Sequence, residues 1–181
     1  MAEGLTSGDF QGENRLDIAI AENGASAVIR KMNAIAAACQ KLDPGVAASL
    51  RGEALRLGEN MESVVKGAAV VALQTAVVSS PVDTGLLRSN WAVKINKSRP
   101  QSHFTPETDK DGIRTIEEGT FVINDTNREA GQIVWISNSA PHAVACEKGH
   151  SAQAPNGMTA LAVQSANQYV HNRRLALRGK M

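Results

Sequence analysis

Aromatic side chains are scarce in this sequence of 181 residues. They make up 3% of it, although 43% of the residues are hydrophobic. The core therefore has to be packed mainly from Ala, Val, Ile, Leu and Met. Because deep cofactor pockets are usually lined by aromatic rings, the composition argues against such a pocket. The length fits a single domain with one core.

Net charge and long apolar runs are scarce as well. The 19 Lys and Arg are balanced by 18 Asp and Glu, and the net charge of +1 indicates no general affinity for nucleic acid or anionic membranes. No run reaches the roughly 18 apolar residues of a membrane span. Residues 1–14 contain no hydrophobic signal region. We expect a soluble protein without membrane contact.

The motifs of nucleotide-binding and catalytic sites are missing too. Neither GxGxxG nor a P-loop occurs, and the two cysteines, Cys39 and Cys146, form no CxxC pair. Cys146 lies four residues from both His142 and His150, a spacing at which helical side chains touch. No orienting group or second ligand pair accompanies it. We expect no enzyme, cofactor or metal site, and two buried cysteines in a reduced chain, although a disulfide between them stays open.

Helical periodicity dominates the first half of the chain. Apolar residues recur at three- and four-residue steps from Ala25 to Leu42 and predict a first helix. Asp43 and Pro44 predict a new helix start, and a heptad-like stripe then runs to Ser79. One helix over 44–79 is the preferred interpretation, with two helices kinked near Gly58 or Gly67 as the alternative. We expect part of this helix to pack on another subunit.

The second half mixes strands and short helices. Alternation from Trp91 to Ile95 predicts a half-buried strand, and the apolar run within 132–137 predicts the central strand of a sheet. Residues 98–112 predict an exposed loop that is mobile or reaches a neighbouring protein. Further helices are predicted within 113–128, over 141–148 with Ser139 as cap and Gly149 as end, and from Met158 to about Asn172.

These elements predict an α+β fold, with long N-terminal helices packed on a small, mostly antiparallel sheet and with a short and a C-terminal helix. A single domain is expected over 14–172, between a flexible arm over 1–13 and a basic tail over 173–181. The tail contains Arg173, Arg174, Arg178 and Lys180. Solvation of these cations is the simplest interpretation, with DNA or an acidic partner as the alternative.

Two segments predict rigid, non-catalytic corners. The first, PVDTGLLRSNW over 81–91, combines a proline, polar capping residues and a glycine with the apolar anchors Leu86, Leu87 and Trp91. The second is ISNSAPHAVACEKGHSAQAPNGM over 136–158. We expect Glu147 to bind backbone amides or Arg88 rather than a substrate, because an unpaired buried carboxylate is costly.

Both segments resemble motifs of the phage putative tail-component family, the tail-completion or head-tail connector proteins of long-tailed bacteriophages. Order and separation agree with the family, while His142, Cys146 and Asn90 depart from its usual residues. The resemblance implies a structural and assembly role for the following residues: Pro81, Val82, Asp83, Thr84, Gly85, Leu87, Arg88, Trp91, Asn138, Pro141, His142, Glu147, Gly149, Ser151, Ala154, Pro155, Gly157 and Met158.

The resemblance also implies a function and a set of partners. The expected protein is a non-enzymatic virion component, assembled in the host cytoplasm, that completes the tail and joins the tail tube to the head connector. Its expected partners are further copies in a ring, six by the symmetry of a tail tube or twelve on the portal side, together with connector, stopper, tube or terminator proteins. A passing contact with genomic DNA is a further expectation. A tail terminator and a tail assembly chaperone are the alternatives.

Overall fold

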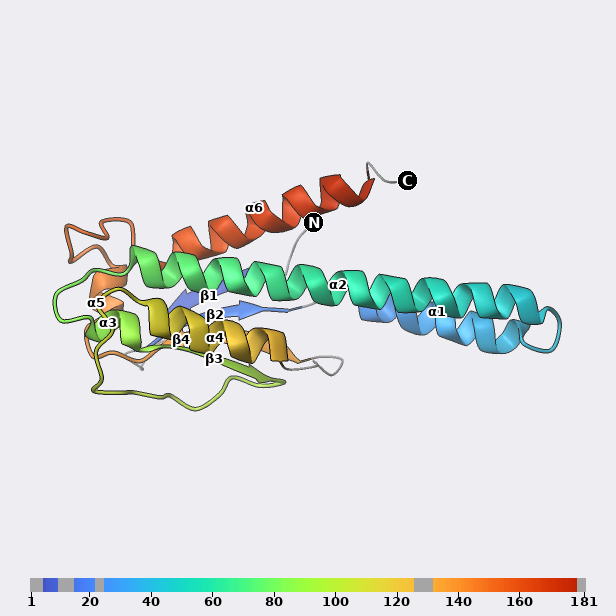
Figure 1. The fold of residues 1–181 in the computed structure, drawn as a ribbon, viewed down its shortest axis with the longest axis horizontal. Coiled ribbons are helices and arrows are strands. Elements are labelled where there is room, and N and C mark those ends of the chain that lie inside the picture. The colour runs from blue at the N-terminus through green and yellow to red at the C-terminus, as the bar shows by residue number, and fades with distance from the viewer. Residues whose placement is uncertain (1–4, 10–14, 22–24, 126–131, 179–181) are drawn as a thin grey trace.

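The computed structural model describes residues 5–9, 15–21, 25–125 and 132–178, and it confirms the α+β class (Figure 1). A layer of helices covers one face of an antiparallel sheet. The elements are β1 (Leu5–Asp9), β2 (Leu16–Ile20), α1 (Ala25–Cys39), α2 (Pro44–Ser79), α3 (Leu86–Ser89), β3 (Trp91–Asn96), α4 (Ile113–Asp125), β4 (Ile133–Asn138), α5 (Ala143–Glu147) and α6 (Thr159–Arg178).

The sheet has the strand order β1-β2-β4-β3, and every neighbouring pair is antiparallel. β4 is an inner strand, as its apolar run predicts: Ile136 pairs with Ile18 of β2 on one side and with Val93 of β3 on the other. The two N-terminal strands were not predicted, and the expected flexible arm is wrong for Leu5–Asp9, which pair with β2 through the backbone. Residues 1–4 and 10–13 of that arm lie outside the described residues.

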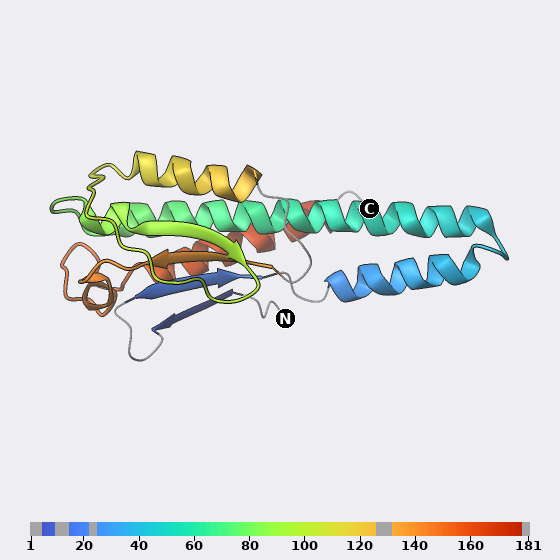
Figure 2. The same ribbon diagram turned by 90° about the horizontal axis from the view of Figure 1, so that it is seen from below.

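Helix α2 is the longest element and confirms the preferred single helix. Asp43 caps it by accepting hydrogen bonds from the Gly45 and Val46 amides at 2.9 and 3.1 Å, and the helix continues through Gly58 and Gly67 without a break. Its 36 residues span about 54 Å at 1.5 Å per residue. The sheet is much shorter than this, so only the C-terminal half of α2 packs on it and the N-terminal half extends beyond it with α1 (Figures 1 and 2).

By length and composition, α2 is the one helix in the described part of the chain that could cross a membrane. In its most apolar 18-residue window, 39% of the residues are buried inside the protein, and the core helix of a soluble protein meets the same criterion.

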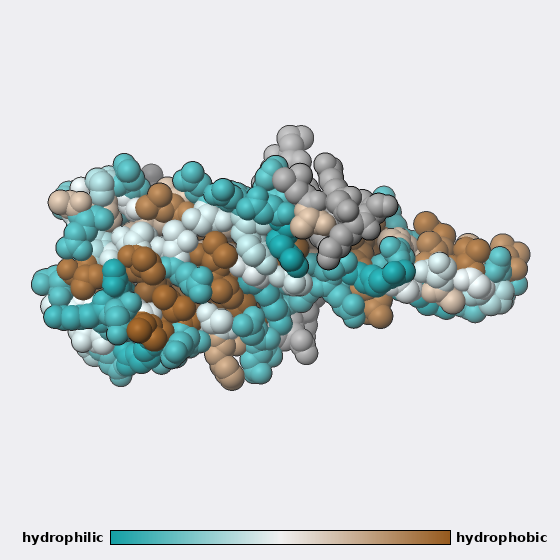
Figure 3. Space-filling model, turned by 45° about the horizontal axis from the view of Figure 1, so that its top comes forward, coloured by the Kyte–Doolittle hydropathy of each residue, from teal (hydrophilic) through white to brown (hydrophobic). Residues whose placement is uncertain are grey.

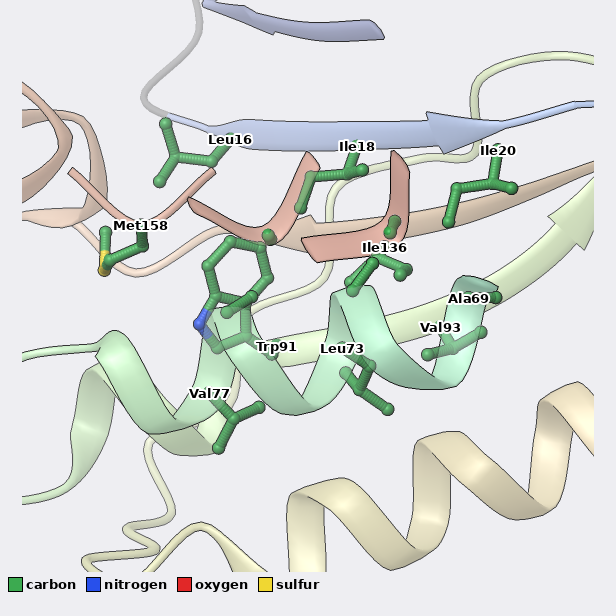
Figure 4. Packing of buried hydrophobic residues seen from close by; sticks show 14 of the residues in the cluster. Leu16, Ile18, Ile20, Ala69, Leu73, Val77, Trp91, Val93, Ile136 and Met158 are labelled. Carbon is green, nitrogen blue, oxygen red and sulfur yellow. The ribbon is translucent and has the colours of Figure 1, made fainter. Parts of the chain in front are cut away.

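The core lies between the sheet and three helices. α2 runs along the middle of the covered face, with α4 beside it over β3 and α6 beside it over β1 and β2. Leu16, Ile18 and Ile20 of β2 point toward Leu73 and Val77 of α2 (Figure 4). Trp91, Val93, Ile136 and Met158 close the same cluster. Small aliphatic residues thus supply most of this core, as the low aromatic content predicts.

The loop over 98–112 passes along the sheet and is anchored by polar contacts. Buried Asp17 binds Arg15 at 2.8 Å and Arg99 at 2.7 Å, while Arg15 also donates to the Pro100 carbonyl at 2.8 Å. Asn90 exchanges two hydrogen bonds of 2.9 Å with the Thr105 backbone. Most side chains between these anchors are exposed, as expected. Mobility and contact with a neighbouring protein stay predictions.

Two helix boundaries correct the sequence analysis. Ser139 does not cap α5, because His142 precedes the helix there and makes no side-chain cap. The helix does end before Gly149, as predicted. The last helix runs to Arg178 instead of about Asn172, so 173–178 of the predicted tail are helical. No Gly or Pro occurs between Met158 and Gly179, and Arg, Leu and Ala favour helix, which explains the extension.

Gly119 allows α4 to lie close to α2 and β3, and this contact can be tested. A methyl group at Gly119 would come within 2.4 Å of Leu73 Cδ2 and 2.9 Å of Val93 Cγ2, whereas one at Gly52 in α2 would contact nothing within 4 Å. Both Gly→Ala changes gain about 1 kcal/mol of helix propensity. We predict that Gly52→Ala stabilises the protein and that Gly119→Ala destabilises it by about 1–3 kcal/mol through overpacking. Urea unfolding measures both, and equal stabilisation by the two changes would contradict the prediction.

Candidate functional site

The two motif segments meet at the end of the molecule where α2 terminates, opposite the α1–α2 hairpin (Figure 1). The first segment turns from α2 through α3 into β3, and the second leads from β4 through α5 into α6. Asn138 joins them directly, because its amide donates to the Leu87 carbonyl at 2.7 Å. The same side chain accepts from the Ala140 amide at 3.0 Å. The predicted residues therefore form one structural unit.

Residues 81–85 form a corner, as predicted. Gly85 opens α3 with φ of 91°, and a Cβ atom there would lie 2.7 Å from the Asp109 carbonyl carbon, so both its conformation and its closeness to the loop favour glycine. The Thr84 hydroxyl accepts from the Leu86 amide at 3.2 Å. Asp83 is exposed, and its side chain makes no hydrogen bond to another described residue. Asp83 thus belongs to the surface of the corner and not to its internal contacts.

Arg88 binds the end of α2. Its guanidinium donates to the carbonyl oxygens of Val78 at 3.0 Å, Ser80 at 3.3 Å and Lys110 at 2.8 Å. The last carbonyls of a helix have no partner within the helix and carry its negative dipole end, so a cation there is stabilising. Arg88 therefore joins α2, the corner and the 98–112 loop. It is not the partner of Glu147, which was one of the two alternatives.

Glu147 binds backbone amides, which confirms the other alternative. Its carboxylate accepts from the Met158 amide at 2.8 Å and the Thr159 amide at 3.0 Å, and also from the Thr159 hydroxyl. These amides belong to the N-terminus of α6, where an anionic side chain is favoured by the helix dipole. Gly157 has φ of 73°, and a Cβ atom there would lie 2.6 Å from Glu147 Oε1. The glycine leaves the space that the carboxylate occupies.

Ser80, Asn90 and Gln153 complete the unit, and sequence reasoning missed all three as site residues. The buried Ser80 hydroxyl accepts from Trp91 Nε1 at 2.8 Å, donates to the Ala76 carbonyl at 2.7 Å and lies 3.2 Å from Met158 Sδ. The side-chain amide of Gln153 makes two hydrogen bonds to the Val82 backbone. Its Oε1 accepts from the Val82 amide at 3.0 Å, and its Nε2 donates to the Val82 carbonyl at 3.2 Å. The contacts of Ser80 with Met158 and of Gln153 with Val82 join residues 78 and 71 positions apart, so no local pattern could have found them.

The remaining predicted residues divide between interior and surface. Ala154 is buried in the core, and Gly149 is packed against the Pro155 carbonyl. Pro141, His142 and Pro155 are exposed, and Ser151 is half-buried.

A pocket of about 350 Å³ lies between the corner and α5. Its lining includes Asp83, Thr84, His142, Cys146 and Gln153. Burial raises the pKa of the Cys146 thiol, so the sulfur is protonated near neutral pH and is a poor nucleophile. Cys39 and Cys146 are both free thiols, and each is half-buried, so the prediction that both are buried is wrong. Among the described residues, no group of three or more His, Cys, Asp and Glu could hold a metal ion.

Asp109 fixes the start of α4 beside the corner. Its carboxylate accepts from the Gly112 amide at 3.1 Å, the Thr115 amide at 2.9 Å and the Thr115 hydroxyl at 2.7 Å. Burial alone would raise the pKa of Asp109, but these hydrogen bonds, with a further one to Asp111, hold it below the ordinary value of 3.8. The folded state therefore binds the Asp109 proton more weakly than the unfolded state does.

Replacement of Asp109 by Asn should accordingly have a pH-dependent effect. A lowered folded pKa gives stability that is present above the ordinary pKa and lost as the pH falls through the folded value. We predict that Asp109→Asn costs about 0.5–2 kcal/mol at pH 7, as for a lost helix cap, and that the cost shrinks below about pH 4. Urea unfolding across this range measures it. Asp83→Asn is the matched control and should change little, and a cost for Asp109→Asn that grows on acidification would contradict the assignment.

Glu147 gives a second test of the joined motifs. Glu147→Ala leaves two helix amides and a hydroxyl without their charged acceptor, so we predict a loss of about 1.5–3 kcal/mol. Glu147→Gln keeps one acceptor oxygen and should lose less. Glu53→Ala, at an exposed position on α2, is the control and should stay within about 0.5 kcal/mol of the parent. Equal stability of all three variants in urea unfolding would contradict the role given to Glu147.

No protein-family model, curated protein or solved structure matches this chain. The polar side chains Arg88, Asn138 and Glu147 are directed at backbone groups of the protein itself.

Proposed function

We propose that this chain is a non-enzymatic structural protein of a long-tailed bacteriophage, located in the neck or tail-completion region. In this proposal, copies of the chain form a ring, with six copies expected, that completes the tail and joins the tail tube to the head connector or stopper. The starting point is the resemblance of the segments over 81–91 and 136–158 to the phage tail-component family.

The observation that carries the proposal is that the polar side chains of the two motif segments bind backbone groups of the protein itself. Arg88 binds the C-terminal carbonyls of α2, Glu147 binds the N-terminal amides of α6, and Asn138 links the two segments. These polar groups are used in fixing the ends of two long helices and in joining the two segments between them. A catalytic site needs nucleophiles, acids or bases that are directed at a bound substrate. An arrangement of this kind supports a rigid subunit more than it supports a catalyst.

The surface of the same unit supports contact with other proteins. Asp83 and His142 are exposed at the rim of the pocket between the corner and α5. Their exposure separates them from the motif residues that hold the fold together. In a neck, this end of the subunit would contact an adjoining ring, such as the connector, stopper, tube or terminator. Arg173 is exposed near the end of α6. In this proposal, it makes the passing contact with genomic DNA.

A tail assembly chaperone is the second candidate. The exposed apolar side chains of the α1–α2 hairpin, which include Ile35, Leu42 and Leu55, are the observation that favours it, because a chaperone also needs an apolar surface for its client. The two candidates differ in whether the protein stays in the mature particle.

The decisive experiment is therefore made on virions. Purified particles of a phage that encodes this chain are analysed by mass spectrometry and by cryo-electron microscopy of the neck. We predict stoichiometric copies arranged as a ring at the head-tail joint. A phage carrying Glu147→Ala should lose tail completion, while one carrying Glu53→Ala should assemble normally. Absence of the chain from mature particles, in a phage that needs it to make tails, would overturn the proposal in favour of the chaperone.

A further inference from the structure

The hairpin of α1 and the first half of α2 has more apolar surface than the chain itself covers. α2 is the one element against which α1 packs extensively within the described residues. From 27 to 60, the fully buried side chains are the three alanines Ala36, Ala47 and Ala54. Val28 and Ile35 are 49% and 53% exposed on α1, and Figure 3 shows apolar surface gathered along the end of the hairpin. An exposed apolar patch of this kind indicates an interaction surface.

Helix α4 carries a second exposed apolar stripe. Ile113 and Phe121 are 55% and 67% exposed, although both are large hydrophobic residues. They lie eight residues apart on the outward face, with Glu117 midway between them and Asp125 one turn further. The opposite face of α4, through Gly119 and Ile123, is buried against the core. The stripe is therefore presented outward by a helix whose position is fixed.

The two surfaces match in length and spacing. Val28 and Ile35 are two helical turns apart, about 10.5 Å, and Ile113 and Phe121 are about 12 Å apart. α1 has 15 residues and α4 has 13, so the helices are of nearly equal length. Apolar residues at two-turn intervals on both helices can interdigitate when the helices pack side by side.

The charges of the two surfaces are opposite. Residues 25–42 contain Arg30, Lys31 and Lys41 and no acidic residue. α4 contains Glu117, Glu118 and Asp125 against one base, Arg114, whose charge is already paired with Glu107. Lys31 lies between the two apolar residues of α1, as Glu117 does between those of α4. Contact between the helices would pair these charges, and such complementarity favours one partner and one register.

The exposed apolar faces of α1 and α4 cannot cover each other within one chain. Figures 1 and 2 show α1 beside the N-terminal half of α2 and α4 beside its C-terminal half, so the two helices lie at different positions along α2. A contact between different surfaces of two identical chains is head-to-tail, and it closes into a ring when the rotation between copies permits.

We propose that α1 of one copy packs on the exposed face of α4 of the next copy, with Val28 and Ile35 against Ile113 and Phe121 and with Lys31 beside Glu117. The inference rests on the proposed function, because it assigns the subunit interface of the ring. It commits to a second copy of this chain as the occupant of both faces.

Disulfide trapping between separate chains tests the interface. In a full-length Cys39→Ala, Cys146→Ala background, one preparation carries Ile35→Cys and a second carries Phe121→Cys. Mild oxidation of the mixture should give a mixed dimer in clear excess over either preparation alone. A chain with both cysteines should give a ladder of covalent oligomers. Ile35→Cys mixed with Val78→Cys is the matched control, because Val78 is 62% exposed but lies outside the proposed interface.

Charge reversal provides the second measurement. Lys31→Glu in the first chain should lower the initial cross-linking rate by about two- to fivefold, the range of an exposed ion pair, and Glu117→Lys in the second chain should restore it. Circular dichroism confirms that each variant is folded. A mixed dimer no more abundant than the Val78 control, at the highest soluble concentration, overturns the interface. Dimers from Ile35→Cys alone at the same rate overturn it in favour of a symmetric α1–α1 contact.

The two proposals fail separately. A chain that forms a ring in virions but gives no Ile35–Phe121 cross-link refutes this interface and leaves the neck function standing. A chain that forms the cross-link but is absent from mature particles refutes the neck function and leaves the interface standing.

Discussion

The hydroxyl group of Ser80 lies where three separate parts of the chain meet, one residue beyond the end of α2. It is bound to the last turn of α2 through Ala76, to the start of β3 through Trp91, and it touches Met158 just before α6. Because Ser80 is 2% exposed, its polar atom needs these partners. The same contact gives the indole N–H of Trp91 its hydrogen-bond acceptor. This N–H is the one polar group of the buried ring. The end of α2, the sheet and α6 are thus positioned relative to one another at a single buried point.

The contacts around this point hold the two helix ends by complementary electrostatics. Arg88 neutralises the carbonyl end of α2, and Glu147 neutralises the amide end of α6. The charges are supplied by the short helices α3 and α5, which are reached through turns and are anchored in the core by Leu87 and Ala143. This explains why so much of the motif consists of turn-forming residues: their task is to bring one cation and one anion to the right helix ends.

Local signals explain what could be predicted from the sequence. α2 has both a start signal in Asp43-Pro44 and a long apolar stripe, and β4 has an unbroken apolar run, so both were predicted correctly. β1 lacks such a signal, because its place depends on backbone pairing with β2. β2 does alternate, with Leu16, Ile18 and Ile20 buried, but it is short and contains Asp17, which would be costly to bury without Arg15 and Arg99. Glu147 was predicted because a carboxylate has few ways to be buried, whereas the contacts of Ser80 with Met158 and of Gln153 with Val82 join residues 78 and 71 positions apart.

The continuity of α2 has a mechanical consequence. The hairpin at one end and the corner that contains Gly85 at the other are connected by a helix with no break at Gly58 or Gly67. A helix resists bending through its hydrogen-bond ladder, so a tilt imposed on the hairpin is carried along α2 to the corner. In the proposed ring, strain at the hairpin of one copy would then reach the corner at the other end of the same copy. If the copies of the proposed ring contact one another through their hairpins, a force on one end of the ring would reach its other end through α2 of every copy.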